Sequence, residues 1–196
     1  TILGTSDMHG NIWGYSYEDN AETDNNGMAR LYTYIQQVRA ENPNTFLVDA
    51  GDDIQGTIMT DDLYNKTPEE PHPVVTAMNY MGYDAMTLGN HEFNYAPQIQ
   101  WNYYNLLTST DKAVAGQPVD VICSNVVETE TNESVFSPYK TFTYKFEDGT
   151  TFTIGLLGFE NMNNANWDVA SHYEGCTFGH PDNTEKSYVY EWENYY

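Results

Sequence analysis

Positive charge is scarce in this sequence. Its 196 residues include 7 lysines and arginines against 29 aspartates and glutamates, a formal net charge of −22. So acidic a chain is repelled by a nucleic-acid backbone and by an anionic membrane surface, and neither is expected as a partner. Any phosphate site needs a local source of positive charge, for which divalent metal ions are the obvious supply. Most of the carboxylates are expected simply to solvate the surface.

Cysteines and long apolar runs are also few. Cys123 and Cys176 lack the close spacing of a metal site, so a single disulfide and two buried free thiols are both open alternatives. No apolar run approaches the length of a membrane span, so membrane insertion is not expected, and no signal peptide is recognised. The first residue is not methionine, which is typical of a processed or trimmed N-terminus.

Strand and helix patterns alternate along most of the chain. Short apolar runs predict buried strands over residues 1–6, 46–48, 83–88 and 119–123. Helical periods with boundary residues predict helices over 28–40, 74–81, 97–107 and 184–196. Strict alternation around a turn at 147–150 predicts an antiparallel hairpin over 141–157. This order predicts an α/β fold, a mixed β-sheet with flanking helices, in which ligands bind beyond the carboxyl ends of the strands.

Side chains that can bind metals follow three of the predicted strands. Asp7 and His9 come after the first strand, and on an extended strand end they would point to the same side. Asp52 follows the second strand behind a glycine, and its two oxygens could bridge two ions. Asn90 follows the third strand and offers an amide oxygen. Each pattern alone is often a surface turn, but the ordered set favours a site for divalent cations.

The segments around these residues closely resemble a known family. The blocks are Asp7-Met8-His9-Gly10, Gly51-Asp52-Asp53-Ile54-Gln55-Gly56 and Gly89-Asn90-His91-Glu92-Phe93. They are similar to the first three blocks of the calcineurin-like metallophosphoesterases, and more narrowly of the secreted 5'-nucleotidase and 2',3'-cyclic-nucleotide phosphodiesterase family. Two later blocks, over residues 124–127 and 155–159, match in order. The resemblance implies a metallophosphoesterase-like sandwich.

The resemblance also implies a two-metal site. One ion would be bound by Asp7, His9 and Asp52, and the other by Asp52 and Asn90, so that Asp52 is the bridge. A metal-bound hydroxide would attack phosphorus in line. His91, beside the ions but not coordinating them, would stabilise the phosphoryl oxygens or protonate the leaving group. These ligand types suit Mn, Zn or Fe without identifying the metal.

One departure from the family pattern bears on the substrate. Many 5'-nucleotidases have an aspartate where this chain has Asn94, and an amide can accept the ring N–H of His91 but cannot stabilise an imidazolium as a carboxylate does. With asparagine at position 94, the block resembles the 2',3'-cyclic-nucleotide phosphodiesterase/3'-nucleotidase branch of the family. This resemblance favours 2',3'-cyclic nucleotides and 3'-nucleotides as substrates. A 5'-nucleotidase or UDP-sugar hydrolase is the alternative. Asn94 and Asn125 are expected either to bind substrate or to hold the residues that do so in position.

A second departure concerns the later histidines of the family's metal site, which have no counterparts here. His172 and His180 are interpreted as surface loop residues, and His72, between two prolines, as structural or exposed. The simplest account is truncation, so residues 1–196 are expected to be the N-terminal portion of a catalytic domain whose nucleotide-binding C-terminal domain is absent. The resemblance implies a secreted, periplasmic or cell-surface location. A non-catalytic metal-binding surface module, or an inactive fragment, is the alternative of another class.

Overall fold

A computed structural model of the 196-residue chain describes residues 1–65, 72–110 and 116–179. Its strands are β1 (Ile2–Thr5), β2 (Tyr15–Ser16), β3 (Ala21–Glu22), β4 (Phe46–Asp49), β5 (Ala85–Met86), β6 (Asp120–Val121), β7 (Val126–Glu128), β8 (Tyr139–Lys145), β9 (Thr151–Leu157) and β10 (Cys176–Phe178). Its α-helices are α1 (Met28–Glu41), α2 (Pro73–Met81), α3 (Pro97–Thr108) and α4 (Asn164–Trp167), and its shorter helical turns are η1 (Met59–Tyr64), η2 (Asn90–Asn94) and η3 (Ala170–His172). The predicted helix over 184–196 and His180 lie outside the described residues.

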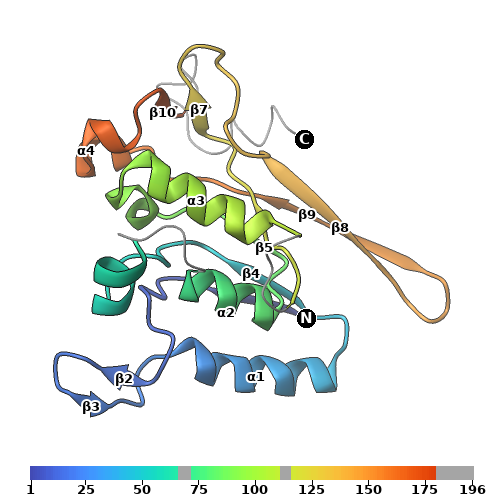
Figure 1. The fold of residues 1–196 in the computed structure, drawn as a ribbon. Coiled ribbons are helices and arrows are strands. Elements are labelled where there is room, and N and C mark those ends of the chain that lie inside the picture. The colour runs from blue at the N-terminus through green and yellow to red at the C-terminus, as the bar shows by residue number, and fades with distance from the viewer. Residues whose placement is uncertain (66–71, 111–115, 180–196) are drawn as a thin grey trace.

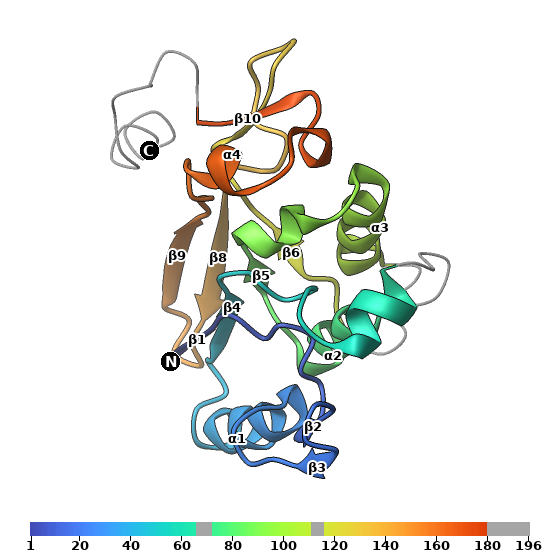
Figure 2. The same ribbon diagram turned by 90° about the vertical axis from the view of Figure 1, so that its left-hand side faces the viewer.

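A parallel sheet with the strand order β1-β4-β5-β6 forms the centre of the fold. Figure 2 shows α2 and α3 on one side of this sheet and the ribbon of β8 and β9 on the other. Because the strands are parallel, their carboxyl ends share one edge, and the segments that carry the predicted metal ligands follow β1, β4 and β5 at that edge. The predicted α/β class with flanking helices is confirmed.

The predicted hairpin is confirmed, but it stands apart from this sheet. Strands β8 and β9 pair antiparallel along seven residues each and extend away from the body of the molecule (Figure 1). The ribbon contacts the sheet through Phe142, whose ring centroid lies 4.4 Å from that of Phe46 on β4. The hairpin was expected to belong to one mixed β-sheet, but the described residues of β8 and β9 pair only with each other and form a separate two-stranded sheet.

Helix α2 follows its sequence pattern closely. The side chains of Val74, Val75, Met78 and Met81 are buried, and each contributes roughly 1.5–3 kcal/mol to folding by leaving water. Gly82 ends the helix in the left-handed conformation, at φ 73°, as its position predicted. Among the described helices, none combines the length and the apolar composition that crossing a membrane requires.

His72 begins α2 and has a structural role, as one of its two interpretations predicted. Its Nδ1 accepts a 3.3 Å hydrogen bond from the N–H of Val74, and its Nε2 lies 3.2 Å from Oδ1 of Asn65. A neutral ring with its proton on Nε2 satisfies both contacts. The residue is 5% exposed, which excludes the exposed alternative, and burial lowers the pKa of His72 to about 4.

The two cysteines are free thiols, so the disulfide alternative is wrong. Cys123 is buried beside Asn125, and burial raises the pKa of its thiol to about 12. Cys176 is only partly buried, on β10, where it lies opposite Glu128 of β7. Cys176 therefore belongs to a separate two-stranded sheet formed by β10 and β7.

Residues 161–179, which carry none of the helix or strand patterns described above, contain α4, η3 and β10. Phe178 of β10 packs its ring against that of Phe93, with 4.9 Å between the centroids. Phe93 belongs to η2, the turn that also carries His91. The late segment is thus folded against the part of the chain where the predicted site lies.

Candidate metal centre

The loop after β1 runs alongside the loop after β4. The N–H groups of Asp7 and His9 donate to the carbonyls of Gly51 and Asp52, each over 2.9 Å. Asp7, His9 and Asp52 have positive φ angles of 57°, 47° and 66°. Residues other than glycine seldom adopt this conformation, and those that do concentrate at functional sites. The paired loops therefore hold three predicted ligands in a strained, closely placed arrangement.

Asp7 and His9 are close, but not for the reason that the sequence suggested. Strand β1 ends at Thr5, and neither residue continues an extended strand. The turn beyond the strand brings Oδ1 of Asp7 to 3.8 Å from Nε2 of His9. Their proximity was predicted correctly, whereas the extended geometry offered as its cause is wrong.

His9, Asp52 and His91 form a group whose possible ligand atoms all lie within 4.8 Å of one another. Nδ1 of His9 lies 2.9 Å from the carbonyl oxygen of Gln55. A carbonyl only accepts, so Nδ1 carries the proton and Nε2 keeps its lone pair, the form in which imidazole binds metals. The imidazole of His9 and the carboxylate of Asp52 are ligand types that suit a divalent cation such as Mn²⁺ or Zn²⁺, and His91 lies beside them.

Two glycines let the loops after β4 and β5 come into contact. A Cβ at Gly51 would lie 2.1 Å from the nitrogen of Gly89, and a Cβ at Gly89 would lie 2.3 Å from Oδ1 of Asp52. The same Oδ1 accepts a 2.8 Å hydrogen bond from the N–H of His91. A larger residue at either glycine would push Asp52 away from His91, so these glycines define the position of the carboxylate.

Glu92, to which the sequence assigned no role, locks these two loops together. Its carboxylate accepts the N–H groups of Gly89, Asp52 and Asp53 over 2.8, 2.8 and 2.7 Å. It is fully buried, and burial raises its pKa to about 7 although the three hydrogen bonds oppose the shift. Its place in the Gly-Asn-His-Glu block was the only sequence signal, because two of its partners lie about 40 residues earlier.

Asp53 stands next to Asp52 in the sequence but belongs to the interior. Burial, together with the carboxylates of Asp49 and Glu92, raises the pKa of Asp53 well above its usual range. Burial among other carboxylates favours the neutral form of this group. Of the two neighbouring aspartates, only Asp52 belongs to the cluster with His9 and His91.

A chain of four side chains leads away from the cluster. Nδ1 of His91 lies 2.6 Å from Oδ1 of Asn94, as the sequence predicted, and Nδ2 of Asn94 donates to Asp168 over 2.9 Å. Asp168 in turn lies 2.9 Å from Nδ1 of His172, which also contacts the carbonyl of Phe93 at 2.9 Å. The interpretation of His172 as a surface loop residue is therefore wrong. Asp168 carried no sequence signal at all.

Asn90 and Asn125 occupy different environments. Asn90 begins η2, directly before His91, and is partly buried. Asn125 is 0% exposed, and its side chain both donates to the carbonyl of Glu160 (2.7 Å) and accepts the N–H of Glu160 (2.8 Å). A direct contact of Asn125 with substrate does not fit this burial, and a supporting role stays a prediction.

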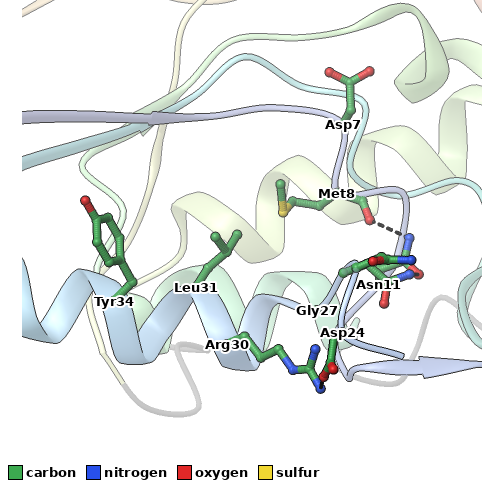
Figure 3. Close-up of a pocket in the computed structure, with 10 residues that line it drawn as sticks. Asp7, Met8, Asn11, Asp24, Gly27, Arg30, Leu31 and Tyr34 are labelled. Carbon is green, nitrogen blue, oxygen red and sulfur yellow. Dashed lines mark hydrogen bonds and ion pairs between the residues drawn. The ribbon is translucent and has the colours of Figure 1, made fainter. Parts of the chain in front are cut away.

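A separate pocket of about 360 Å³ lies beside Asp7, between the loop after β1 and helix α1 (Figure 3). The carboxylate of Asp7 points away from the helix in this view, and Arg30 forms a 2.7 Å ion pair with Asp24. Of the predicted site residues, Asp7 alone lines this pocket. The pocket is therefore distinct from the cluster of His9, Asp52 and His91.

Known proteins are similar to this chain in sequence and in fold. The 2',3'-cyclic-nucleotide 2'-phosphodiesterase/3'-nucleotidase of Salmonella typhimurium is 32% identical over 196 residues, covering 97% of this chain and 29% of that protein. The 5'-nucleotidase of Rattus norvegicus is 44% identical over 98 residues, covering 48% of this chain and 16% of that protein. The crystal structure of the calcineurin-like phosphoesterase YfkN from Bacillus subtilis is similar with a TM-score of 0.70 and 32% identity, covering 91% of this chain and 53% of that chain.

These relatives are longer than the chain described here, which spans less than a third of the two nucleotidase relatives. The profile of the calcineurin-like phosphoesterases matches residues 1–194, nearly the whole sequence. The match includes all three blocks that carry Asp7, Asp52 and His91. The chain therefore belongs to the calcineurin-like phosphoesterase family.

Proposed function

We propose that this chain carries part of a two-metal site that hydrolyses nucleotide phosphoesters, with 2',3'-cyclic nucleotides and 3'-nucleotides as the preferred substrates. The observation that carries the proposal is the close grouping of His9, Asp52 and His91 at the carboxyl edge of the sheet. Family membership supports the reaction class. Residues 1–196 would form the N-terminal portion of the catalytic domain, with further ligands and the nucleobase pocket supplied from outside the described residues.

The protein's own groups define where the ions would bind. Asp7 and His9 would bind one ion, Asn90 the other, and Asp52 would bridge them, because its backbone pairs with the loop after β1 and its carboxylate contacts the loop after β5. Two bound divalent ions supply an activated water and positive charge at the phosphoryl group. In a chain of net charge −22, that local positive charge is what lets an anionic substrate approach.

His91 would act on the substrate through Nε2, because its Nδ1 is bonded to Asn94. Once Nε2 has taken up a proton, the ring can donate to the phosphoryl oxygens or pass that proton to the leaving oxygen. The backbone of His91 meanwhile orients Asp52. One residue thus contributes its backbone to the metal site and its side chain to the substrate.

The preference for cyclic and 3' substrates is supported by Asn94 and by the phosphodiesterase relative, which matches 97% of this chain. A 5'-nucleotidase or UDP-sugar hydrolase is the second candidate, and the 44% identity to the rat 5'-nucleotidase over half the chain favours it. The family also supports a secreted, periplasmic or cell-surface location, which fractionation of cells that express the protein would test.

Hydrolysis of 2',3'-cyclic AMP, 3'-AMP and 5'-AMP by the whole protein that contains these residues, in the presence of Mn²⁺, tests the proposal, whereas the isolated 196-residue chain is expected to be weak or inactive. We expect faster release from the first two substrates, and loss of all release in Asp52→Asn. Glu147→Gln, which neutralises an exposed carboxylate at the turn of the β8–β9 ribbon, is the control that keeps the rate. Turnover of 5'-AMP alone would favour the second candidate. Metal binding without hydrolysis of any substrate would favour a non-catalytic module.

A further inference from the structure

We propose that Asp168 is a positioning residue that determines, through Asn94, which ring nitrogen of His91 carries the proton. The inference rests on the proposed function, in which His91 acts on the phosphoryl group. Asp168 follows α4 directly and lies 74 residues after Asn94 in the sequence. It contacts neither the metal cluster nor His91 in the described structure, so its effect must pass through the amide between them.

The direction of each hydrogen bond follows from Asp168. An ionised carboxylate only accepts, so the Asn94 atom that lies 2.9 Å from Oδ2 of Asp168 must be the amide nitrogen. The amide oxygen of Asn94 therefore faces His91, 2.6 Å from Nδ1. Because this oxygen also only accepts, Nδ1 of His91 carries the proton. In the neutral ring Nε2 then keeps its lone pair, so Nε2 is the nitrogen that takes up the proton which His91 donates toward the substrate.

Asp168 is itself held firmly in place. Its Oδ1 accepts the N–H of Val169 over 2.6 Å and lies 2.9 Å from Nδ1 of His172. The same Nδ1 lies 2.9 Å from the carbonyl of Phe93, and since both partners accept, it carries a proton. His172 thereby ties η3 to η2. The side chain of Asp168 is 4% exposed, so little water competes with Asn94 for its Oδ2.

This arrangement gives the asparagine at position 94 a physical explanation. Where an aspartate contacts the imidazole, the carboxylate itself selects the tautomer. Here the amide of Asn94 lies between His91 and the carboxylate of Asp168. The carboxylate determines the orientation of the amide, and the amide oxygen then determines the tautomer of His91. The single change Asn94→Asp would place a second carboxylate against that of Asp168, across the present 2.9 Å contact. Ionising both groups there would cost free energy through charge repulsion. Asn94 and Asp168 therefore act as a pair.

The variant Asp168→Asn reverses the chain of donors and acceptors. The N–H of Val169 and the proton of His172 would hold the oxygen of the new amide, so that its NH₂ group faces Asn94. Asn94 would then turn its own oxygen toward position 168 and its NH₂ group toward His91. Nδ1 of His91 would have to accept, and the proton would move to Nε2. A merely structural role for Asp168 predicts no such exchange.

Nitrogen NMR of the whole protein, labelled at histidine and free of metal, reads this tautomer directly at a pH where the ring is neutral. We expect the Nδ1–H form of His91 in the parent, the Nε2–H form in Asp168→Asn, and the Nδ1–H form again in the double variant Asp168→Asn/Asn94→Asp. His91→Gln assigns the signals. Glu174→Gln, which neutralises an exposed carboxylate six residues along the chain, is the matched control and should leave the tautomer unchanged.

The hydrolysis of 2',3'-cyclic AMP provides a second readout. We expect kcat to fall by ~100-fold or more in Asp168→Asn with little change in KM, and to recover in the double variant. An Nε2–H form in the parent, or an unchanged tautomer in folded Asp168→Asn, would overturn the inference. If Asp168→Asn does not fold, the parent and the double variant still decide it. An inactive parent with the expected tautomers would count against the proposed function alone.

Discussion

The backbone N–H of His91 donates a 2.8 Å hydrogen bond to Oδ1 of Asp52. This contact joins the loop after β5 to the loop after β4, so the side chain proposed to act on the substrate and the proposed bridging ligand position each other. Both loops are also held by Glu92. Changes within this small unit are therefore expected to alter metal binding while leaving the distant hairpin and sheet intact.

Gly89→Ala tests the contact between the loops. The new Cβ would lie 2.3 Å from Oδ1 of Asp52, which must move to make room. We expect the affinity for Mn²⁺ to fall at least ~10-fold, measured by titration calorimetry. Gly4→Ala is the matched control, because a Cβ at Gly4 meets nothing within 4 Å. Equal Mn²⁺ affinity in the two variants would contradict the proposed position of Asp52.

Glu92→Gln tests the three hydrogen bonds by which the buried carboxylate of Glu92 joins the loops after β4 and β5. The amide that replaces the carboxylate has one oxygen, and its NH₂ group would face a backbone N–H that it cannot bond. Leaving a buried donor unsatisfied costs about 1–3 kcal/mol, and we expect that loss in urea unfolding at pH 8, above the pKa of about 7. Glu147→Gln, on the exposed turn, should not change the unfolding midpoint. An unchanged midpoint in Glu92→Gln would show that the three hydrogen bonds do not stabilise the loops.

Acid is expected to destabilise the protein through His72. Its pKa is about 4 in the folded chain and 6.5 when exposed, so the unfolded state binds more protons between these values. Its contribution is fully present above pH 6.5 and is lost as the pH falls toward 4, by up to about 3 kcal/mol. His72→Asn keeps a helix-capping side chain without the titration. Urea unfolding at several pH values should show a shallower acid loss in this variant, and identical slopes would contradict the assignment.

Divalent metal is expected to stabilise the folded chain. A ligand that binds only the folded state adds about 2.7 kcal/mol at a concentration of 100 Kd, so Mn²⁺ should raise the melting temperature and a chelator should reverse the rise. Asp52→Asn and His9→Gln should abolish the effect, since both remove a proposed ligand. A thermal shift that persists in both variants would place the ion elsewhere.

Asn94→Asp tests the link between this position and the substrate. A carboxylate beside His91 would resemble the 5'-nucleotidase pattern, so we expect the ratio of activity on 5'-AMP to that on 2',3'-cyclic AMP to rise. The new charge also faces Asp168 across a 2.9 Å contact, and we expect a lower melting temperature at neutral pH. If the ratio does not change, Asn94 has no part in substrate choice.

The sequence by itself determined the features that depend on neighbours along the chain. The apolar period of 74–81 and Gly82 predicted α2 and its end, and the alternation of 141–157 predicted the β8–β9 ribbon. The blocks at Asp7, Asp52 and Asn90 predicted which side chains follow which strands. These signals are local, because helix and strand periods and turn residues act over a few positions.

The tertiary structure decided which of these residues meet. The contact of Asn94 with Asp168 spans 74 residues, and Glu92 reaches Asp52 across 40, so no local period could report either one. The left-handed backbone at Asp7 and His9, and the free thiol of Cys123, follow from how loops and strands pack. Packing also set the direction of the hydrogen bonds from Asp168 to His91, because a buried carboxylate with fixed donors leaves Asn94 only one orientation.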